Sequence, residues 1–181
     1  KRLLAFSSIN HIGFMLLAIM SYQYMSEGTI FFYLIIYLIT TFGVFSVILN
    51  LRTSEGEITL LTGLNGLKAS SRSKAISMLV FLFSLAGIPP FAGFFAKFFI
   101  LSASINEGFY ILSVIAVISS VIAAFYYLSV IKNMFFNESE TELLLDNNRL
   151  SSFIFTSSAI IITLFFFYPD PLINLVDSLF K

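Results

Sequence analysis

A lysine stands inside one of the most apolar stretches of the chain, SLAGIPPFAGFFAKFF at residues 84–99. Lys97 has phenylalanines on both sides, and apart from Lys132, close to the end of another apolar stretch, it is the only Lys, Arg, Asp or Glu within any stretch long enough to cross a membrane. An ionisable group at that depth is costly, and it usually faces other helices or a water-filled cavity. Because an apolar surrounding disfavours the ammonium form, such a lysine can bind and release a proton. The residue therefore predicts proton transfer.

Lys97 also has a purely structural interpretation. A lysine can stretch its flexible stem and place its charge among lipid headgroups. Eight apolar or small residues follow Lys97 before Asn106, which puts the membrane surface about 12 Å away along a helix axis. That distance is long for a lysine side chain, so burial is the expectation and snorkelling is the alternative.

Other polar side chains could line a path to the lysine. Ser7 and His11 are four residues apart and therefore share one face of a helix. A histidine near mid-membrane is either a proton relay or a hydrogen-bonded packing residue, and the sequence favours neither. Hydroxyl groups occur on two further apolar stretches, where interhelical packing is the expected role and path lining the alternative. They are Tyr33, Tyr37, Thr40 and Thr41 on one stretch, and Ser119, Ser120, Tyr126 and Tyr127 on the other.

A pair of prolines predicts a break in the helix that carries the lysine. Residues 75–105 form one apolar run, and a straight helix of that length would extend about 46 Å against about 30 Å of hydrocarbon core. Pro89 and Pro90 lack amide protons, and Gly87 permits a sharp bend. Freed carbonyls at membrane depth must face protein or water. We expect one helix to end near Ala86, a break across Gly87–Pro90, and a second helix from Phe91.

The composition places the chain in a membrane. The 181 residues are 58% hydrophobic and 11% charged, whereas a soluble domain carries about 25% charged residues. Five apolar runs are long enough for membrane helices, and they are continuous rather than alternating, which disfavours membrane strands. The predicted fold is an all-α polytopic membrane protein, one membrane domain over residues 1–181. The predicted spans are Leu3–Tyr22, Thr29–Leu51, Ala75–Ile105, Phe109–Met134 and Leu150–Tyr168.

The composition also excludes several kinds of site. There is no cysteine and only one histidine, so disulfides, thiolate sites and a histidine-built metal site are excluded. The formal net charge is zero and the basic residues form no patch, so no nucleic-acid partner is expected. We expect no metal and no cofactor in this chain.

Basic residues predict the orientation. If all five runs cross the membrane, eight basic residues lie on one side and Lys181 alone on the other. The positive-inside rule makes the first side the cytoplasmic or matrix side, with the N-terminus there. The charged start is not interpreted as a signal peptide, because further spans follow it. The eight residues are Lys1, Arg2, Arg52, Lys68, Arg72, Lys74, Lys132 and Arg149.

Two polar segments lie outside the spans. The acidic run NESETELLLDNN, residues 137–148, is interpreted as a solvated connector. The C-terminal run PDPLINLVDSLFK begins with Asp170 and Pro171, which favour a helix start. Its apolar face predicts a short helix in the membrane interface.

Two motifs carry a family resemblance. KRLLAFSSINHIG, followed about eighty residues later by SLAGIPPFAGFFAKFFIL, closely resembles subunit 2 of NADH dehydrogenase in respiratory complex I, a family of antiporter-like proton-pumping membrane subunits. The resemblance covers essentially the whole chain, but only the last five of about fourteen helices of the family protein. It implies that Lys97 is the lysine of the broken twelfth helix, in the outward half-channel. It also implies that His11 is the histidine after the Ser-Ser motif.

The resemblance further implies partners. The family's first half-channel, with its own lysines, has no counterpart in this sequence, so a separate chain is expected to supply those helices unless the sequence is a fragment. Other membrane-arm subunits and lipids are expected neighbours. The whole complex would use FMN, iron–sulfur clusters and ubiquinone. A composition rich in Phe, Ile and Leu, together with the family, predicts the mitochondrial inner membrane, with a bacterial plasma membrane as the alternative.

The predicted function is that of a proton-translocating component of respiratory complex I, NADH:ubiquinone oxidoreductase, with no redox chemistry in this chain. One alternative is a fragment of a Mrp-type cation/proton antiporter that works without redox partners. Another is a structural piece that only completes the packing of the membrane arm. Lys97 argues against the last, because a costly buried charge adds nothing to packing.

Overall fold

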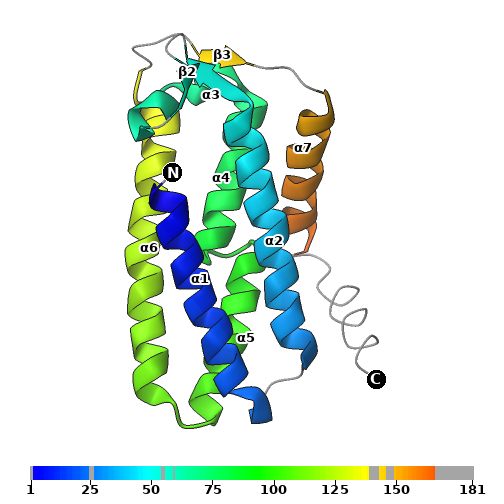
Figure 1. The fold of residues 1–181 in the computed structure, drawn as a ribbon, viewed down its shortest axis with the longest axis vertical. Coiled ribbons are helices and arrows are strands. Elements are labelled where there is room, and N and C mark those ends of the chain that lie inside the picture. The colour runs from blue at the N-terminus through cyan, green and yellow to red at the C-terminus, as the bar shows by residue number, and fades with distance from the viewer. Residues whose placement is uncertain are drawn as a thin grey trace.

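Helices account for most of the described chain. The computed structural model describes residues 2–24, 27–53, 56–58, 60–138, 143–145 and 149–165. Its helices run along the long axis of an elongated bundle (Figure 1), which confirms the predicted all-α membrane architecture. They are α1 (Arg2–Met20), α2 (Glu27–Leu49), α3 (Leu67–Ser70), α4 (Arg72–Ala86), α5 (Ala92–Asn106), α6 (Tyr110–Phe136) and α7 (Arg149–Leu164), with 3₁₀ turns at Tyr22–Tyr24 and Leu61–Leu64.

The predicted third span is two half-helices. In the part of the chain that the structure describes, α1, α2 and α6 are the helices that are long and apolar enough to cross a membrane alone. Helices α4 and α5 have 15 residues each and follow one another along the bundle (Figure 1). The break between Ala86 and Ala92 confirms the interruption predicted at Gly87–Pro90. Helix α7 has 16 residues, and the end of its predicted span at Tyr168 lies outside the described residues, as does the predicted interfacial helix from Asp170.

A small antiparallel sheet closes one end of the bundle. Its strands are β1 (Leu51–Thr53), β2 (Gly56–Glu57) and β3 (Leu143–Leu145), in the order β2-β1-β3. Leu51 pairs with Leu145 and Thr53 with Leu143, so the loop after α2 is joined to the loop after α6. The segment 137–148, which the sequence analysis interprets as a solvated connector, therefore contains one short strand, β3, that pairs with β1.

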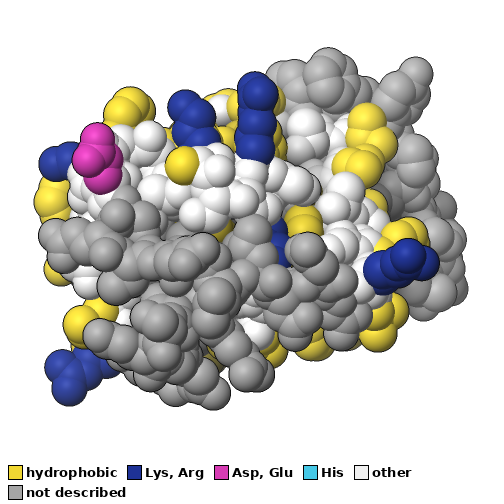
Figure 2. Space-filling model, turned by 90° about the horizontal axis from the view of Figure 1, so that it is seen from above, with side chains coloured by type: hydrophobic (Ala, Val, Ile, Leu, Met, Phe, Trp, Pro, Cys, Tyr) yellow, Lys and Arg dark blue, Asp and Glu magenta, His cyan; other side chains and the backbone are white. Residues whose placement is uncertain are grey.

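The same end of the bundle carries exposed basic side chains. Figure 2 looks onto it from above and shows Lys and Arg side chains around the described surface. The predicted sorting of basic residues to one end therefore agrees with the helix directions. The exposed members are Arg2, Lys68, Arg72, Lys132 and Arg149, whereas Lys74 of the same set is buried.

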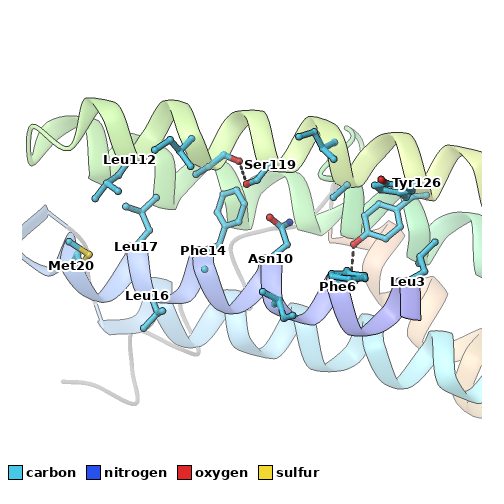
Figure 3. A pocket seen from close by; sticks show the side chains of 18 of the residues that line it. Leu3, Phe6, Asn10, Phe14, Leu16, Leu17, Met20, Leu112, Ser119 and Tyr126 are labelled. Carbon is cyan, nitrogen blue, oxygen red and sulfur yellow. Dashed lines mark hydrogen bonds between the residues drawn. The ribbon is translucent and has the colours of Figure 1, made fainter. Parts of the chain in front are cut away.

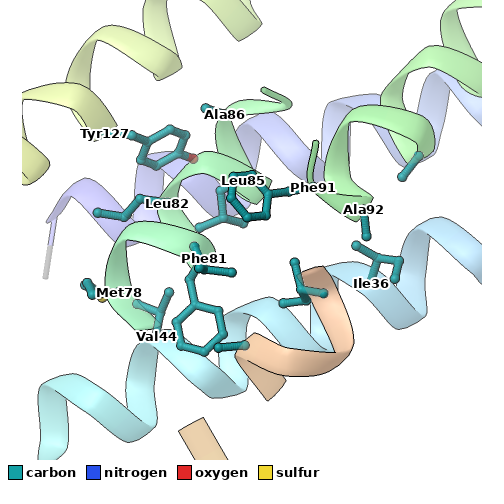
Figure 4. Packing of buried hydrophobic residues seen from close by; sticks show 14 of the residues in the cluster. Ile36, Val44, Met78, Phe81, Leu82, Leu85, Ala86, Phe91, Ala92 and Tyr127 are labelled. Atoms are coloured by element: carbon teal, nitrogen blue, oxygen red, sulfur yellow. The ribbon is translucent and has the colours of Figure 1, made fainter. Parts of the chain in front are cut away.

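The core surrounds the broken helix. Helix α4 contacts α2, α6 and α7, and α5 contacts α1, α2 and α6. Phe81, Leu82 and Leu85 of α4 are almost fully buried among residues of the neighbouring helices (Figure 4). Helix α6, on the outside of the bundle, is much more exposed than α2. In its most apolar segment only 17% of the residues are buried, compared with 39% in that of α2. The ends of α4 and α5 that flank the break thus lie in the core, whereas Pro89 and Pro90 of the break itself are exposed.

Candidate functional site

Helix α4 ends in a Schellman motif. Gly87 adopts a left-handed conformation with φ of 79°, and its N–H donates to the carbonyl of Ser84 at 3.0 Å. The N–H of Ile88 donates to the carbonyl of Phe83, also at 3.0 Å. This pair of bonds satisfies two of the carbonyls that a helix end leaves open. Gly87 suits the position because it has no Cβ to strain at positive φ.

The next two carbonyls lose their donors to the prolines. In a continued helix, the carbonyls of Leu85 and Ala86 would accept from the N–H groups of residues 89 and 90. Both of those residues are proline and have no N–H. The Lys97 ammonium donates to these two carbonyls instead, at 2.9 Å to Leu85 and 3.3 Å to Ala86. The lysine therefore replaces the hydrogen-bond donors that the prolines remove.

The third donor position of the ammonium is also used. Lys97 Nζ donates to the hydroxyl oxygen of Ser120 on α6 at 2.8 Å, and an ammonium group has three donors in all. Nζ also lies 5.1 Å from the ring centroid of Phe14, within the range of a cation–π contact. The residue is 6% exposed. Its charge points to the break and to the negative end of α4, rather than toward the membrane surface as the snorkelling alternative requires.

The two half-helices approach each other closely at Gly93. Its N–H, near the start of α5, donates to the Ser84 hydroxyl at 3.2 Å. A Cβ added at Gly93 would overlap the Ser84 carbonyl. The absence of a side chain at this position allows α5 to begin beside the end of α4. This approach sets Lys97, one turn further along α5, within reach of the freed carbonyls.

His11 shares a cavity with Lys97. Its Nδ1 is hydrogen-bonded to the Tyr33 hydroxyl at 2.7 Å, and its ring centroid lies 4.9 Å from that of Tyr37. Its Nε2 is buried and has no partner among the described residues. His11, Tyr33, Tyr37, Thr40 and Lys97 all line one small cavity of about 10 Å³, which is space for about one water molecule. The two titratable side chains His11 and Lys97 therefore border one small cavity.

The predicted path residues separate into two groups. Tyr33, Tyr37 and Thr40 line the cavity, and the Tyr37 hydroxyl continues the polar contacts by donating to Ser8 at 3.0 Å. The other group does not reach the cavity. Ser7 is bonded to the Tyr127 hydroxyl at 2.6 Å, and Thr41 is half-buried and absent from the cavity lining.

Sequence reasoning missed two contacts of this site. Ser120 on α6 is expected from the sequence to pack between helices, with path lining as the alternative, yet it accepts a hydrogen bond from the ammonium directly. Ser84 was not considered, yet it holds the start of α5. The contact of Ser120 could not be predicted from the spacing of residues within one helix, because it depends on how α5 and α6 are aligned against each other. The contact of Ser84 could have been predicted, since a small polar residue three positions before Gly87 can face a second helix that packs closely against the first.

Known proteins resemble this chain over most of its length. The family model described as "NADH:quinone oxidoreductase/Mrp antiporter, TM" matches residues 1–123. NADH-quinone oxidoreductase subunit N of Rhodospirillum rubrum is 44% identical over 143 residues, which is 79% of this chain and 29% of that protein. The corresponding subunit of Wolbachia sp. subsp. Brugia malayi is 44% identical over 138 residues, 76% of this chain and 29% of that protein. The chain thus spans under a third of these relatives' length.

A solved structure agrees with the fold. A chain of respiratory complex I from Thermus thermophilus, with bound aureothin, superposes with a TM-score of 0.84 at 28% sequence identity. The superposition covers 96% of this chain and 39% of that chain. The predicted resemblance to the antiporter-like subunits of complex I is confirmed by these matches: the chain belongs to the NADH:quinone oxidoreductase/Mrp antiporter family of membrane proteins.

Proposed function

We propose that this chain is a proton-translocating component of the membrane arm of respiratory complex I, in which Lys97 carries the proton through the outward half-channel. The observation that carries the proposal is the Lys97 ammonium on the carbonyls of Leu85 and Ala86, beside the cavity that it shares with His11. None of the described hydrogen bonds of Lys97 reaches a carboxylate. A buried lysine of this kind is costly to keep charged, so small changes in hydration can shift it between its charged and neutral forms.

In this mechanism the break stabilises the charged state and the cavity connects it to the next group. The two carbonyls and the Ser120 hydroxyl favour the ammonium form, because all three accept hydrogen bonds. Water in the cavity would link Lys97 to His11, whose Nε2 has no hydrogen-bond partner among the residues that the structure describes. A proton passes between these groups when the hydration of the cavity changes. Release on the far side of the membrane from the basic end completes the transfer.

The driving force and the remaining helices belong to other parts of the assembly. We propose that quinone reduction elsewhere in the complex, with FMN, iron–sulfur clusters and ubiquinone, changes the surroundings of Lys97. Other membrane-arm subunits and lipids surround the chain, and a separate chain or the rest of a longer one supplies the first half-channel. The N-terminus lies on the inner side. The curated relatives described above are bacterial, so the mitochondrial inner membrane stays a prediction beside the bacterial plasma membrane.

Two substitutions test the role of Lys97 in the assembled complex. Lys97→Met removes the titratable group, and we expect proton pumping coupled to NADH oxidation to fall strongly. Lys97→Arg keeps a cation with several donors but cannot release its proton, so it should also lower pumping while it preserves assembly better than Met does. Undiminished pumping in Lys97→Met contradicts the proposal. Full pumping in Lys97→Arg indicates a structural cation at the break.

A cation/proton antiporter is the second candidate, because the matching family model covers Mrp antiporters as well as oxidoreductase subunits. The two functions differ in their assemblies. If the chain co-purifies with flavin- and iron–sulfur-containing subunits, the complex I function holds. If it purifies in a small transporter without redox subunits and exchanges cations for protons, the antiporter function replaces it.

A further inference from the structure

Two tyrosines of α2 lie against the ring of His11 and use their hydroxyl groups differently. The Tyr37 ring lies 4.9 Å from the His11 ring, measured between centroids, and its hydroxyl donates to Ser8 at 3.0 Å. The Tyr33 ring lies 5.9 Å away, and its hydroxyl is hydrogen-bonded to Nδ1 of His11 at 2.7 Å. Among the residues that the structure describes, Tyr33 is therefore the group that is hydrogen-bonded to the imidazole.

Packing holds the Tyr33 ring in this position. Tyr33 is 2% exposed, and its ring is stacked on that of Phe14 with 6.2 Å between centroids and an interplanar angle of 17°. Phe14 stands on α1 and points toward α6 (Figure 3), and its ring also lies 5.1 Å from the Lys97 ammonium. Because the surrounding side chains are closely packed, rotation of the O–H bond is the main freedom left to Tyr33.

The direction of this hydrogen bond decides which nitrogen of His11 carries the proton. In a neutral imidazole one ring nitrogen is a donor and the other is an acceptor. If Tyr33 donates to Nδ1, the proton is on Nε2 and the ring has no free lone pair. If the Tyr33 oxygen accepts from Nδ1–H instead, Nε2 keeps its lone pair. The bond at Nδ1 therefore decides whether Nε2 can accept a proton.

Proton transfer from Lys97 requires one of these two arrangements. Nε2 is buried and has no hydrogen-bond partner among the described residues, and His11, Tyr33 and Lys97 line the same cavity. Transfer through one water breaks an N–H bond of the ammonium, leaves a neutral amine and forms an N–H bond at Nε2. The resulting imidazolium donates from both nitrogens. The Tyr33 oxygen must therefore accept from Nδ1–H before and after the transfer.

We propose that Tyr33 is a positioning residue for His11: its hydroxyl oxygen accepts the hydrogen bond from Nδ1–H, so that Nε2 keeps the lone pair that takes the proton from Lys97. The inference rests on the proposed function of Lys97 and adds a control on the group that receives the proton. Rotation of the Tyr33 O–H bond, together with a shift of the ring proton from Nδ1 to Nε2, closes the route.

The ring nitrogens of His11 can be observed directly, because it is the only histidine in the sequence. In an assembly where this chain alone carries isotope-labelled histidine, solid-state NMR should show a protonated Nδ1 and an unprotonated Nε2. In Tyr33→Phe we expect a second set of signals, with the proton on Nε2. Tyr37→Phe is the matched control and should keep the wild-type spectrum, since its ring also lies against His11 but its hydroxyl bonds Ser8. A proton on Nε2 in the wild type, an unchanged spectrum in Tyr33→Phe, or the same change in both variants overturns the proposal.

Proton pumping tests whether this control matters for transport. Tyr33→Phe should lower the pumping rate of the assembled complex about five-fold, as expected when one buried hydrogen bond no longer favours the accepting form of His11. Tyr126→Phe changes an exposed tyrosine of α6 and should pump at the wild-type rate. When Lys97→Met pumps poorly, wild-type pumping in Tyr33→Phe, or an equal fall in Tyr126→Phe, overturns this inference alone. Wild-type pumping in Lys97→Met overturns the proposed function instead, and the His11 spectrum still decides the bond to Tyr33.

Discussion

Two of the lysines that the structure describes are buried, and they use similar chemistry in different surroundings. Lys97 is 6% exposed and Lys74 is 3% exposed. Each donates from Nζ to backbone carbonyls at the end of a helix: Lys97 to Leu85 and Ala86 of α4, and Lys74 to Asn50 after α2 at 3.3 Å. In both cases a cation meets the negative end of a helix.

The surroundings distinguish the two lysines. Lys74 lies at the basic end of the bundle, where the Asn50 amide donates to the carbonyl of Ser46 and to the hydroxyl of Ser151, so that α2, α4 and α7 are joined. Lys97 lies at a break inside the bundle and faces a cavity together with His11. Burial and helix capping alone therefore do not identify a proton-carrying lysine. The small cavity that Lys97 borders together with His11 is the reason why we propose proton transfer at Lys97.

The largest expected effect is at the junction that positions Lys97. Gly93→Ala should lower the free energy of unfolding by about 3 kcal/mol, because the new methyl group overlaps the Ser84 carbonyl. Gly63→Ala is the control, since its new methyl group would contact side-chain atoms of Ile58, the nearest being Cγ2 at 2.9 Å, and no backbone atom among the three nearest. Thermal denaturation of the purified assembly measures both. Equal losses would contradict the close approach of α4 and α5.

Gly87→Ala should separate backbone strain from disturbance of the lysine. A left-handed alanine costs about 1–2 kcal/mol, and the new Cβ would lie 2.9 Å from Cδ of Lys97. Gly108→Ala has the same kind of strain, at φ of 90°, but open space around it. We expect similar losses of thermal stability and a fall in proton pumping only for Gly87→Ala. If both variants pump alike, the position of the Lys97 stem does not matter for transport.

Ser120→Ala removes one of the three acceptors of the ammonium. The expected loss of stability is about 1 kcal/mol, and pumping should fall less than in Lys97→Met because two carbonyls still accept from Nζ. Ser119→Ala is the neighbouring control, since that hydroxyl donates to the Ala116 carbonyl of its own helix. Pumping rates of the two variants, measured side by side, check the assignment. A larger effect in Ser119→Ala would argue against it.

The smallest effect is expected in the Lys74 region. Ser151→Ala removes an acceptor of the Asn50 amide and should cost about 0.5–1 kcal/mol, because the amide keeps its bond to the Ser46 carbonyl. Proton pumping should stay at the wild-type rate. A clear fall in pumping, with the assembly intact, would show that the region around Lys74 also takes part in transport.

Much of the fold was predictable because its signals are local. Apolar runs predicted the membrane helices, and the length of residues 75–105 together with Pro89 and Pro90 predicted the break. The hydrogen-bonded strand at Leu143–Leu145 was not predictable, because it depends on pairing with a loop about ninety residues away in the chain. The burial of Lys74 was missed for the same reason, since its partner Asn50 belongs to another helix.

The site was predictable in its parts but not in its connections. Lys97, His11 and the hydroxyl side chains of Tyr33, Tyr37 and Thr40 on α2 could be identified as candidates from the sequence, because polar groups are rare in apolar helices. It did not show that the lysine would donate to the carbonyls freed by the prolines. That contact depends on α5 starting beside the end of α4, a tertiary arrangement that Gly93 and Ser84 determine.

The most direct test of the account is the number of protons translocated per NADH oxidised, measured in membranes with Lys97→Met and Lys74→Met side by side. Both substitutions remove a buried cation from helix-end carbonyls, so both should lower stability. If Lys97 carries the proton, the proton ratio is reduced for Lys97→Met and stays at the wild-type value for Lys74→Met. A wild-type ratio in Lys97→Met, or an equal reduction in both variants, would contradict the claim that Lys97 carries the proton.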